Sequence, residues 1–151
     1  MSDLHIHEFF HDAARIVVSL FRVFPRPVPI YAEDICGPDE PDEYGLHSHR
    51  YQACFATMLW LGEEGYLRYD QPIRQDAIDQ AVLTGKCFNA LIAPTVAVAD
   101  PDLPRQVTWQ RSTLAFALED AMTHKDPTRL QEHFHSLVQV MTEGRDGSQG
   151  R

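Results

Sequence analysis

Basic residues are scarce in this chain of 151 residues, which has 13 Lys and Arg against 22 Asp and Glu and a formal net charge of −9. The shortage is greatest in residues 1–95, which contain seven basic and fourteen acidic side chains. Proteins bind nucleic acid largely because Lys and Arg displace counterions from the phosphates. The composition therefore excludes a broadly basic surface and leaves only a local basic patch open.

Long apolar runs and paired cysteines are also lacking. No segment approaches the roughly 20 apolar residues that cross a bilayer, and the N-terminal MSDLHIHEFF lacks the basic start and cleavage site of a signal peptide. Cys36, Cys54 and Cys87 are widely spaced, odd in number and next to apolar residues. We therefore expect a cytoplasmic protein without membrane contact, whose cysteines are reduced and buried.

Motifs of catalysis and cofactor binding are absent from the sequence. It contains no G-x-S-x-G, no G-x-G-x-x-G, no phosphate-binding glycine loop and no C-x-x-C. Among the eight histidines, His7 and His11 have a spacing that would place them on one helical face. A metal site needs about three or four converging ligands, and no Cys or carboxylate cluster nearby completes this pair. The sequence thus predicts no enzyme, no metal and no cofactor.

The spacing of apolar residues predicts a mainly α-helical fold with a small β-hairpin. A long amphipathic helix over 3–24 is ended by a proline-rich turn. The further predicted elements are a helix at 30–36, a helix from Ser48 to Glu64 ended by Gly65, strands at 66–69 and 77–83, a helix after Thr84, and helices at 109–123 and from Pro127 onward. We expect a domain at 1–95, a helical hairpin at 96–143 packed on it or in a dimer interface, and a disordered tail at 144–151.

The segments ATMLWLGEEGYLRY and AVLTGKCFNALI resemble the third helix, wing and closing helix of bacterial winged-helix regulators, the broad group that includes the MarR and PadR families. The matching residues are Leu61, Glu63, Glu64, Gly65, Tyr66 and Leu67, followed by Val82, Leu83 and Thr84. The resemblance covers about residues 8–95 and implies a winged-helix domain that binds DNA in transcription regulation. The sequence departs from the pattern at the acidic loop 37–45, because the corresponding turn usually has ~3–4 residues.

The resemblance implies DNA contacts at the start of the third helix and on the wing. The candidates are His47, His49, Arg50 and Gln52 for the bases, and Arg68, Arg74 and Lys86 for the phosphates. Arg50 is the single strongest candidate. Ordinary surface charge is the alternative explanation for the cations.

A second apolar stripe on the same helix points to a different use of this surface. Tyr51, Phe55 and Leu59 follow one another at i, i+4 spacing, with Trp60 beside them. These positions face outward in a minimal winged helix, and exposed aromatic side chains often mark a contact. Either the first helix or the C-terminal hairpin covers them, or they form a partner or dimer surface together with Phe9 and Phe134.

Three functions remain open from the sequence. The first is a homodimeric winged-helix regulator that binds DNA. The second is an acidic winged-helix interaction module, an adaptor or subunit without DNA binding, in which Asp39, Glu40, Asp42 and Glu43 contact a basic partner or form a solvated connector. The third, a small-molecule sensor, requires a cavity between the domain and the C-terminal hairpin, with Trp109 and Phe116 as candidate lining residues.

Overall fold

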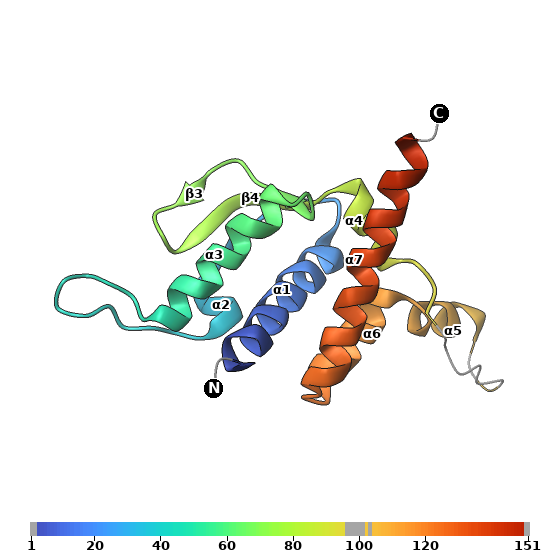
Figure 1. Ribbon diagram of the computed structural model, residues 1–151, viewed down its shortest axis with the longest axis horizontal. Helices are drawn as coiled ribbons and strands as arrows, with labels where there is room; N and C mark the ends of the chain where they lie inside the picture. Colours follow the sequence, from blue (N-terminus) through green and yellow to red (C-terminus); the bar gives the residue numbers. More distant parts are fainter. Residues whose placement is uncertain (1–2, 96–101, 103, 150–151) are drawn as a thin grey trace.

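The computed structural model describes residues 3–95, 102 and 104–149. These residues form a mainly helical fold with a small antiparallel sheet (Figure 1). In chain order the elements are α1 (Asp3–Val23), β1 (Val28–Tyr31), α2 (Ala32–Cys36), α3 (His49–Glu63), β2 (Leu67–Arg68), β3 (Pro72–Ile73), β4 (Ala77–Leu83), α4 (Gly85–Leu91), α5 (Arg105–Arg111), α6 (Leu114–Thr123) and α7 (Pro127–Gln149).

Strand β4 is the centre of the sheet. It pairs antiparallel with β1, β2 and β3, and the strand order is β1-β4-β2. The β2–β4 register places Leu67 opposite Leu83, as expected for the predicted hairpin. On the other side, Ile30 of β1 lies opposite Ile78. The sheet therefore joins a segment directly after α1 to the hairpin that follows α3.

Two N-caps that the sequence predicts, Ser48 and Thr84, are present. The Ser48 hydroxyl accepts a hydrogen bond from the Tyr51 amide at 3.2 Å, and the Thr84 hydroxyl accepts one from the Cys87 amide at 3.2 Å. A side-chain oxygen at this position satisfies an amide that has no partner within the helix. These two hydroxyls fix the starts of α3 and α4.

The end of α3 follows from Gly65, as predicted. This glycine has φ of 82°, a left-handed conformation that side chains other than glycine disfavour. The Tyr66 amide donates to the Leu61 carbonyl at 2.9 Å, and the Gly65 amide donates to the Gly62 carbonyl at 3.3 Å. This hydrogen-bond pair is a Schellman motif. It turns the chain directly into β2.

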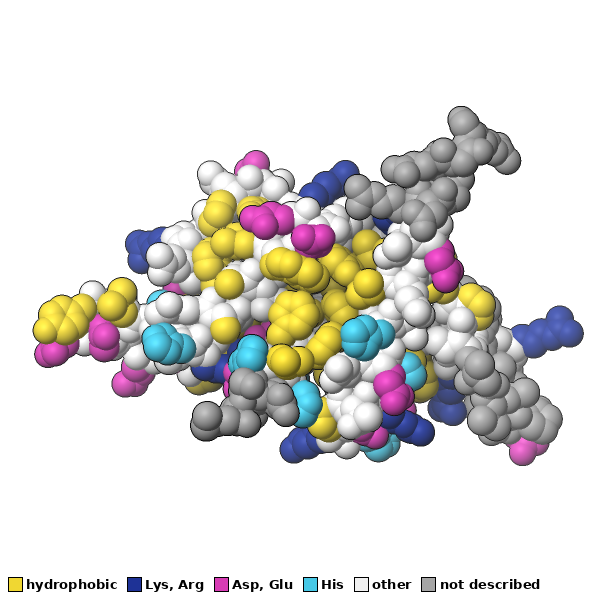
Figure 2. Space-filling view, in the orientation of Figure 1, with side chains coloured by type: hydrophobic (Ala, Val, Ile, Leu, Met, Phe, Trp, Pro, Cys, Tyr) yellow, Lys and Arg dark blue, Asp and Glu magenta, His cyan; other side chains and the backbone are white. Residues whose placement is uncertain are grey.

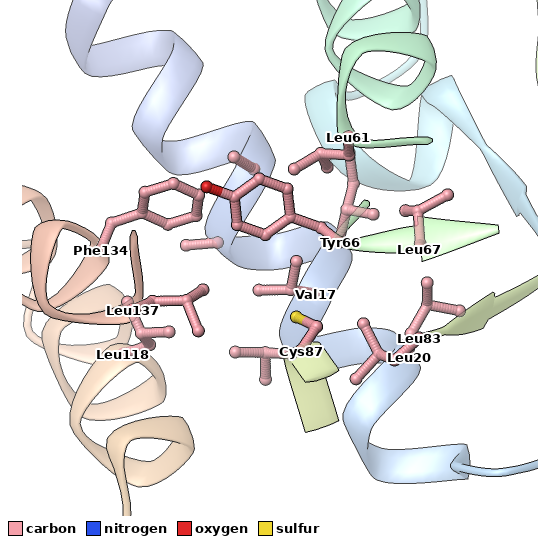
Figure 3. Close-up of a cluster of buried hydrophobic side chains, with 14 of the residues drawn as sticks. Val17, Leu20, Leu61, Tyr66, Leu67, Leu83, Cys87, Leu118, Phe134 and Leu137 are labelled. Atoms are coloured by element: carbon pink, nitrogen blue, oxygen red, sulfur yellow. The ribbon is translucent and has the colours of Figure 1, made fainter. Parts of the chain in front are cut away.

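Helix α1 lies at the centre of the molecule, between α3 and the C-terminal helices α6 and α7 (Figure 1). Its buried residues, such as Val17 and Leu20, meet Leu61 of α3, Leu83 of β4 and Leu137 of α7 in one apolar cluster (Figure 3). The C-terminal helix pair α6–α7 thus packs on α1 of the same chain. Both ends of the described chain contribute to one core.

The structure corrects two predicted elements and extends a third. The helix expected at 30–36 is divided into β1 and α2, because residues 30 and 31 pair with β4. The helix expected at 109–123 is two helices, since Thr113 caps a new one by accepting from the Phe116 amide at 3.2 Å. A disordered tail was expected from residue 144, whereas α7 runs to Gln149. The predicted connector at 96–101 lies outside the described residues.

None of the helices in the described ranges is long and apolar enough to cross a membrane.

Candidate interaction surface

Arg50, the strongest candidate for a DNA contact, is engaged inside the protein. Its two terminal guanidinium nitrogens donate to the two carboxylate oxygens of Asp12 at 2.6 and 2.7 Å. Its Nε also lies 3.7 Å from Glu8. Asp12 is 1% exposed. The Arg50 side chain, at the start of α3, is therefore turned toward α1 and away from any DNA groove that α3 would enter.

The pKa values of this pair reflect the contact. The hydrogen bonds to Asp12 raise the pKa of Arg50 above its usual value and outweigh the effect of burial. Burial by itself raises the pKa of Asp12. The hydrogen bonds from Arg50 and His11 lower this pKa by more than burial raises it, so the net effect is a decrease. Both groups are therefore charged at neutral pH and neutralise each other.

His47 is also fixed by carboxylates. Its Nδ1 lies 3.0 Å from Asp39 and its Nε2 lies 3.0 Å from Asp76. The imidazole stacks on the Tyr51 ring with centroids 3.9 Å apart, and the Tyr51 hydroxyl donates to Asp76 at 2.9 Å. Burial and this hydrogen bond raise the pKa of Tyr51. The side chains of Asp39, His47, Tyr51 and Asp76 thus hold the end of the acidic loop to the β3–β4 turn.

The other candidate DNA contacts are on the surface and are spread over several elements. His49 and Gln52 are exposed on the first turn of α3, and Gln52 donates to the His47 carbonyl at 2.8 Å. The cations Arg68, Arg74 and Lys86 are exposed on β2, the β3–β4 turn and α4. None of the side chains that the structure describes forms an ion pair with any of these three cations.

Aromatic rings join α1, α3 and α7. Phe9 of α1 packs edge-on against Trp60 of α3 at 5.3 Å and against Phe134 of α7 at 6.4 Å. Tyr66 stacks on Trp60 at 5.7 Å and on Phe134 at 6.0 Å, and Figure 3 shows the Tyr66 and Phe134 rings side by side. Such ring pairs stabilise beyond their buried area. The first helix thus contacts Trp60 of the predicted stripe, and Phe134 of the last helix is joined to Trp60 through Phe9 and Tyr66.

Two residues expected on a partner surface belong to the interior instead. Phe134 is 1% exposed because rings of α1 and the Tyr66 ring pack against it, and Tyr51 is 5% exposed beneath the stacked His47 imidazole. Phe9, Phe55 and Leu59 are half-buried. Trp60, at 36% exposed, is the member of the predicted set that remains on the surface.

An apolar patch does remain where α1, α3 and α7 meet (Figure 2). We use the name aromatic patch for Ile6, Phe9, Phe10 and Trp60, of which Ile6 and Trp60 are exposed. In the view of Figure 2, acidic and histidine side chains border this patch, and Lys and Arg side chains lie toward the periphery. This face of the molecule is thus apolar and acidic.

A second apolar feature, which the sequence reasoning missed, lies on the loop between α2 and α3. Tyr44 is 80% exposed and Leu46 is 58% exposed. The carboxylate of Asp42 accepts hydrogen bonds from the amides of both residues at 2.9 Å, and the Asp42 amide donates to the Leu46 carbonyl at 2.8 Å. Such Asx-type turns order a loop locally. The signal in the sequence was two large apolar side chains within an otherwise polar loop.

Asp39 joins the start of the acidic loop to its end. Asp39 accepts a hydrogen bond from the Ser48 amide at 3.0 Å and contacts His47. Hydrogen bonding by the Ser48 side chain and backbone, and then by His47, lowers the pKa of the Asp39 carboxyl. Glu40 and Glu43 are exposed beside them. In the structure the acidic loop extends past residue 45 and covers residues 37–48, from the end of α2 to the start of α3. It presents two apolar side chains, Tyr44 and Leu46, among carboxylates on a shaped turn that projects from the body of the molecule (Figure 1).

The described residues offer no group of three or more His, Cys, Asp or Glu side chains that could hold a metal ion. Cys54 and Cys87 are buried, and burial raises the pKa of Cys87 to about 12. A buried thiol with a raised pKa is a poor nucleophile because the thiolate is the reactive form.

Comparisons of the chain with known protein families, with curated proteins and with solved structures give no match.

Proposed function

We propose that this chain is a winged-helix protein-interaction module, an adaptor or subunit that contacts a basic partner through the acidic loop. The observation that carries the proposal is the exposure of Tyr44 and Leu46 on a turn built by Asp42. Large apolar side chains on a protruding loop are stabilised when a partner covers them. A preformed turn also loses less conformational freedom on binding than a flexible loop.

The order of elements supports the winged-helix part of this proposal. The resemblance at residues 8–95 predicts three helices followed by a hairpin and a closing helix. The helices α1, α2 and α3, the β2–β4 hairpin and α4 follow in that order. Strand β1 completes a small sheet with the hairpin.

Charge favours a basic partner over DNA. The acidic loop has four carboxylates at residues 39, 40, 42 and 43, and phosphates would be repelled there. Arg50 is neutralised by Asp12, so the start of α3 lacks the cation that a recognition helix would offer. A partner surface with Lys or Arg around an apolar pocket matches both properties of the loop.

The test is partner capture with the purified full chain and extract of the source organism. We expect the wild type to retain a stoichiometric basic protein, and the Tyr44→Ala/Leu46→Ala double variant to lose it. Both side chains are exposed, so the double variant keeps the fold. Ile73→Ala is the matched control, since Ile73 is an exposed apolar residue on the wing. Equal capture by the double variant, or the absence of a stoichiometric partner, would contradict the proposal.

DNA binding is the second candidate, favoured by the exposed cations Arg68, Arg74 and Lys86. Its test is fluorescence anisotropy of labelled duplex DNA fragments in low salt. A complex that weakens with rising salt, and weakens further in the Arg68→Gln/Arg74→Gln variant, would establish this function. If no salt-sensitive complex forms, DNA binding is ruled out and the interaction module remains.

A further inference from the structure

A groove of about 970 Å³ lies on a part of the molecule that the proposed function does not use. Three parts of the chain form most of its lining, namely α1, the β1–α2 segment and the α6–α7 pair, and Arg50 of α3 adds to them. Neither the acidic loop nor the aromatic rings Trp60 and Phe9 contribute to it. Its volume is at the upper end of the ~300–1,000 Å³ typical of small-molecule sites. The groove lies between the two parts predicted from the sequence, the domain at 1–95 and the C-terminal helical hairpin.

The floor of the groove is apolar. Val18 of α1, Ile35 of α2 and Leu130 of α7 line it, and each is almost fully buried. One apolar side chain thus comes from each of the three parts. A ligand body that lies on this floor is stabilised mainly by the burial of its own apolar surface, at roughly 25 cal/mol for each Å² removed from water.

One wall of the groove is a row of donor side chains on α1. His7, His11, Arg15, Ser19 and Arg22 follow at spacings of three or four residues, so they share one helical face. Arg22 is paired with Glu119 across the groove, and His11 contacts Asp12. Arg15 is exposed and forms no ion pair with the side chains that the structure describes.

The charges on the groove leave Arg15 without a partner. The lining holds four carboxylates, Glu8, Asp34, Glu119 and Asp126, and four basic side chains, Arg15, Arg22, Arg50 and Lys125. Arg22 is paired with Glu119, and Arg50 is shared between Glu8 and the buried Asp12. Arg15 and Lys125 form no ion pair with the described side chains, so both cations are open to an anionic ligand.

We propose that the groove binds a small organic anion with an apolar body, a carboxylate or sulfonate whose charged group contacts Arg15. A guanidinium matches two oxygens of such a group with two parallel hydrogen bonds. The apolar body lies over Val18, Ile35 and Leu130. This site is independent of partner binding through the acidic loop.

The probe is 8-anilinonaphthalene-1-sulfonate, whose fluorescence rises when its apolar rings leave water. We expect saturable binding at one site in the full chain. N-phenyl-1-naphthylamine has the same rings without the sulfonate, and we expect it to bind about tenfold more weakly, because a hydrogen bond to a charged group contributes roughly 1.5–3 kcal/mol. Equal affinity for the two probes would overturn the role of the anion.

Three variants locate the site. Arg15→Gln is expected to weaken sulfonate binding about tenfold. Arg26→Gln is the matched control, since Arg26 is an exposed arginine outside the groove lining. Trp60→Ala reports binding at the aromatic patch instead. An unchanged affinity in Arg15→Gln, or a loss in Trp60→Ala, would overturn the proposal, whereas the capture experiment on the acidic loop is unaffected by either result.

Discussion

Arg50 and Asp12 form two hydrogen bonds, at 2.6 and 2.7 Å, between the first turn of α3 and the middle of α1. The pair joins residues 38 positions apart in the sequence. A planar guanidinium that meets a carboxylate in this way fixes orientation as well as distance. The contact therefore sets how α3 is seated on the central helix.

Replacing Arg50 tests this contact. Arg50→Ala leaves the buried Asp12 carboxylate without its cation, and breaking a buried pair costs about 3–5 kcal/mol. We expect a loss near the lower limit, about 3 kcal/mol, because Arg50 is itself 30% exposed. Urea unfolding measures the change. Arg68→Ala, which removes an exposed cation without an ion pair among the described residues, should stay within about 0.5 kcal/mol. Equal effects of the two variants would show that the pair does not stabilise the fold.

The lowered pKa of Asp12 predicts a dependence of stability on acid pH. A carboxyl whose pKa is lower in the folded than in the unfolded state stabilises the fold above the unfolded value of about 3.9. This contribution is lost as pH falls through that value toward the folded pKa. We expect the free energy of unfolding of Asp12→Asn to fall less between pH 5 and pH 2.5 than that of the wild type. Parallel curves would contradict the assignment.

The aromatic cluster contains a core residue, Phe134, and a surface residue, Trp60, and their replacements should lower stability by different amounts. Phe134→Ala opens a cavity under α7, and such a truncation costs about 3–5 kcal/mol. Trp60→Ala should cost less, because part of this side chain is already in water. Thermal unfolding of both variants gives the comparison. A larger loss in Trp60→Ala than in Phe134→Ala would mean that Trp60 anchors the cluster.

The aromatic patch also gives a test for the homodimer that the sequence predicts. A second copy seated on Ile6, Phe9 and Trp60 would cover their exposed area, as a two-fold interface does with the same surface on both subunits. We expect a dimer mass by light scattering for the wild type and a monomer mass for Trp60→Glu. Tyr44→Glu, a charge of the same sign on the acidic loop, should leave the mass unchanged. A monomer mass for the wild type would contradict this dimer.

Local signals in the sequence predicted the elements that local chemistry determines. Ser48, Thr84 and Gly65 act at the helix ends where they were expected, because a cap depends on atoms within a few residues of it. Strand β4 has the predicted bounds, 77–83. These features needed no knowledge of the tertiary fold.

The sequence could not predict what depends on distant partners. Ile30 and Tyr31 form a strand only because β4, more than 40 residues later, pairs with them, and a short apolar run does not distinguish strand from helix. Arg50 looked like a free cation because nothing near it in the sequence points to Asp12. Phe134 was placed on a surface because its partners Phe9 and Tyr66 come from α1 and the segment after α3.

The single core shared by α1 and the α6–α7 pair limits how this gene product can be shortened. A fragment that stops at residue 95 would present Val17 and other α1 residues to water where Leu118 and Leu137 now cover them. Newly wetted apolar surface of this kind promotes aggregation. Any recombinant version that keeps the acidic loop in its native shape must therefore also encode the last two helices.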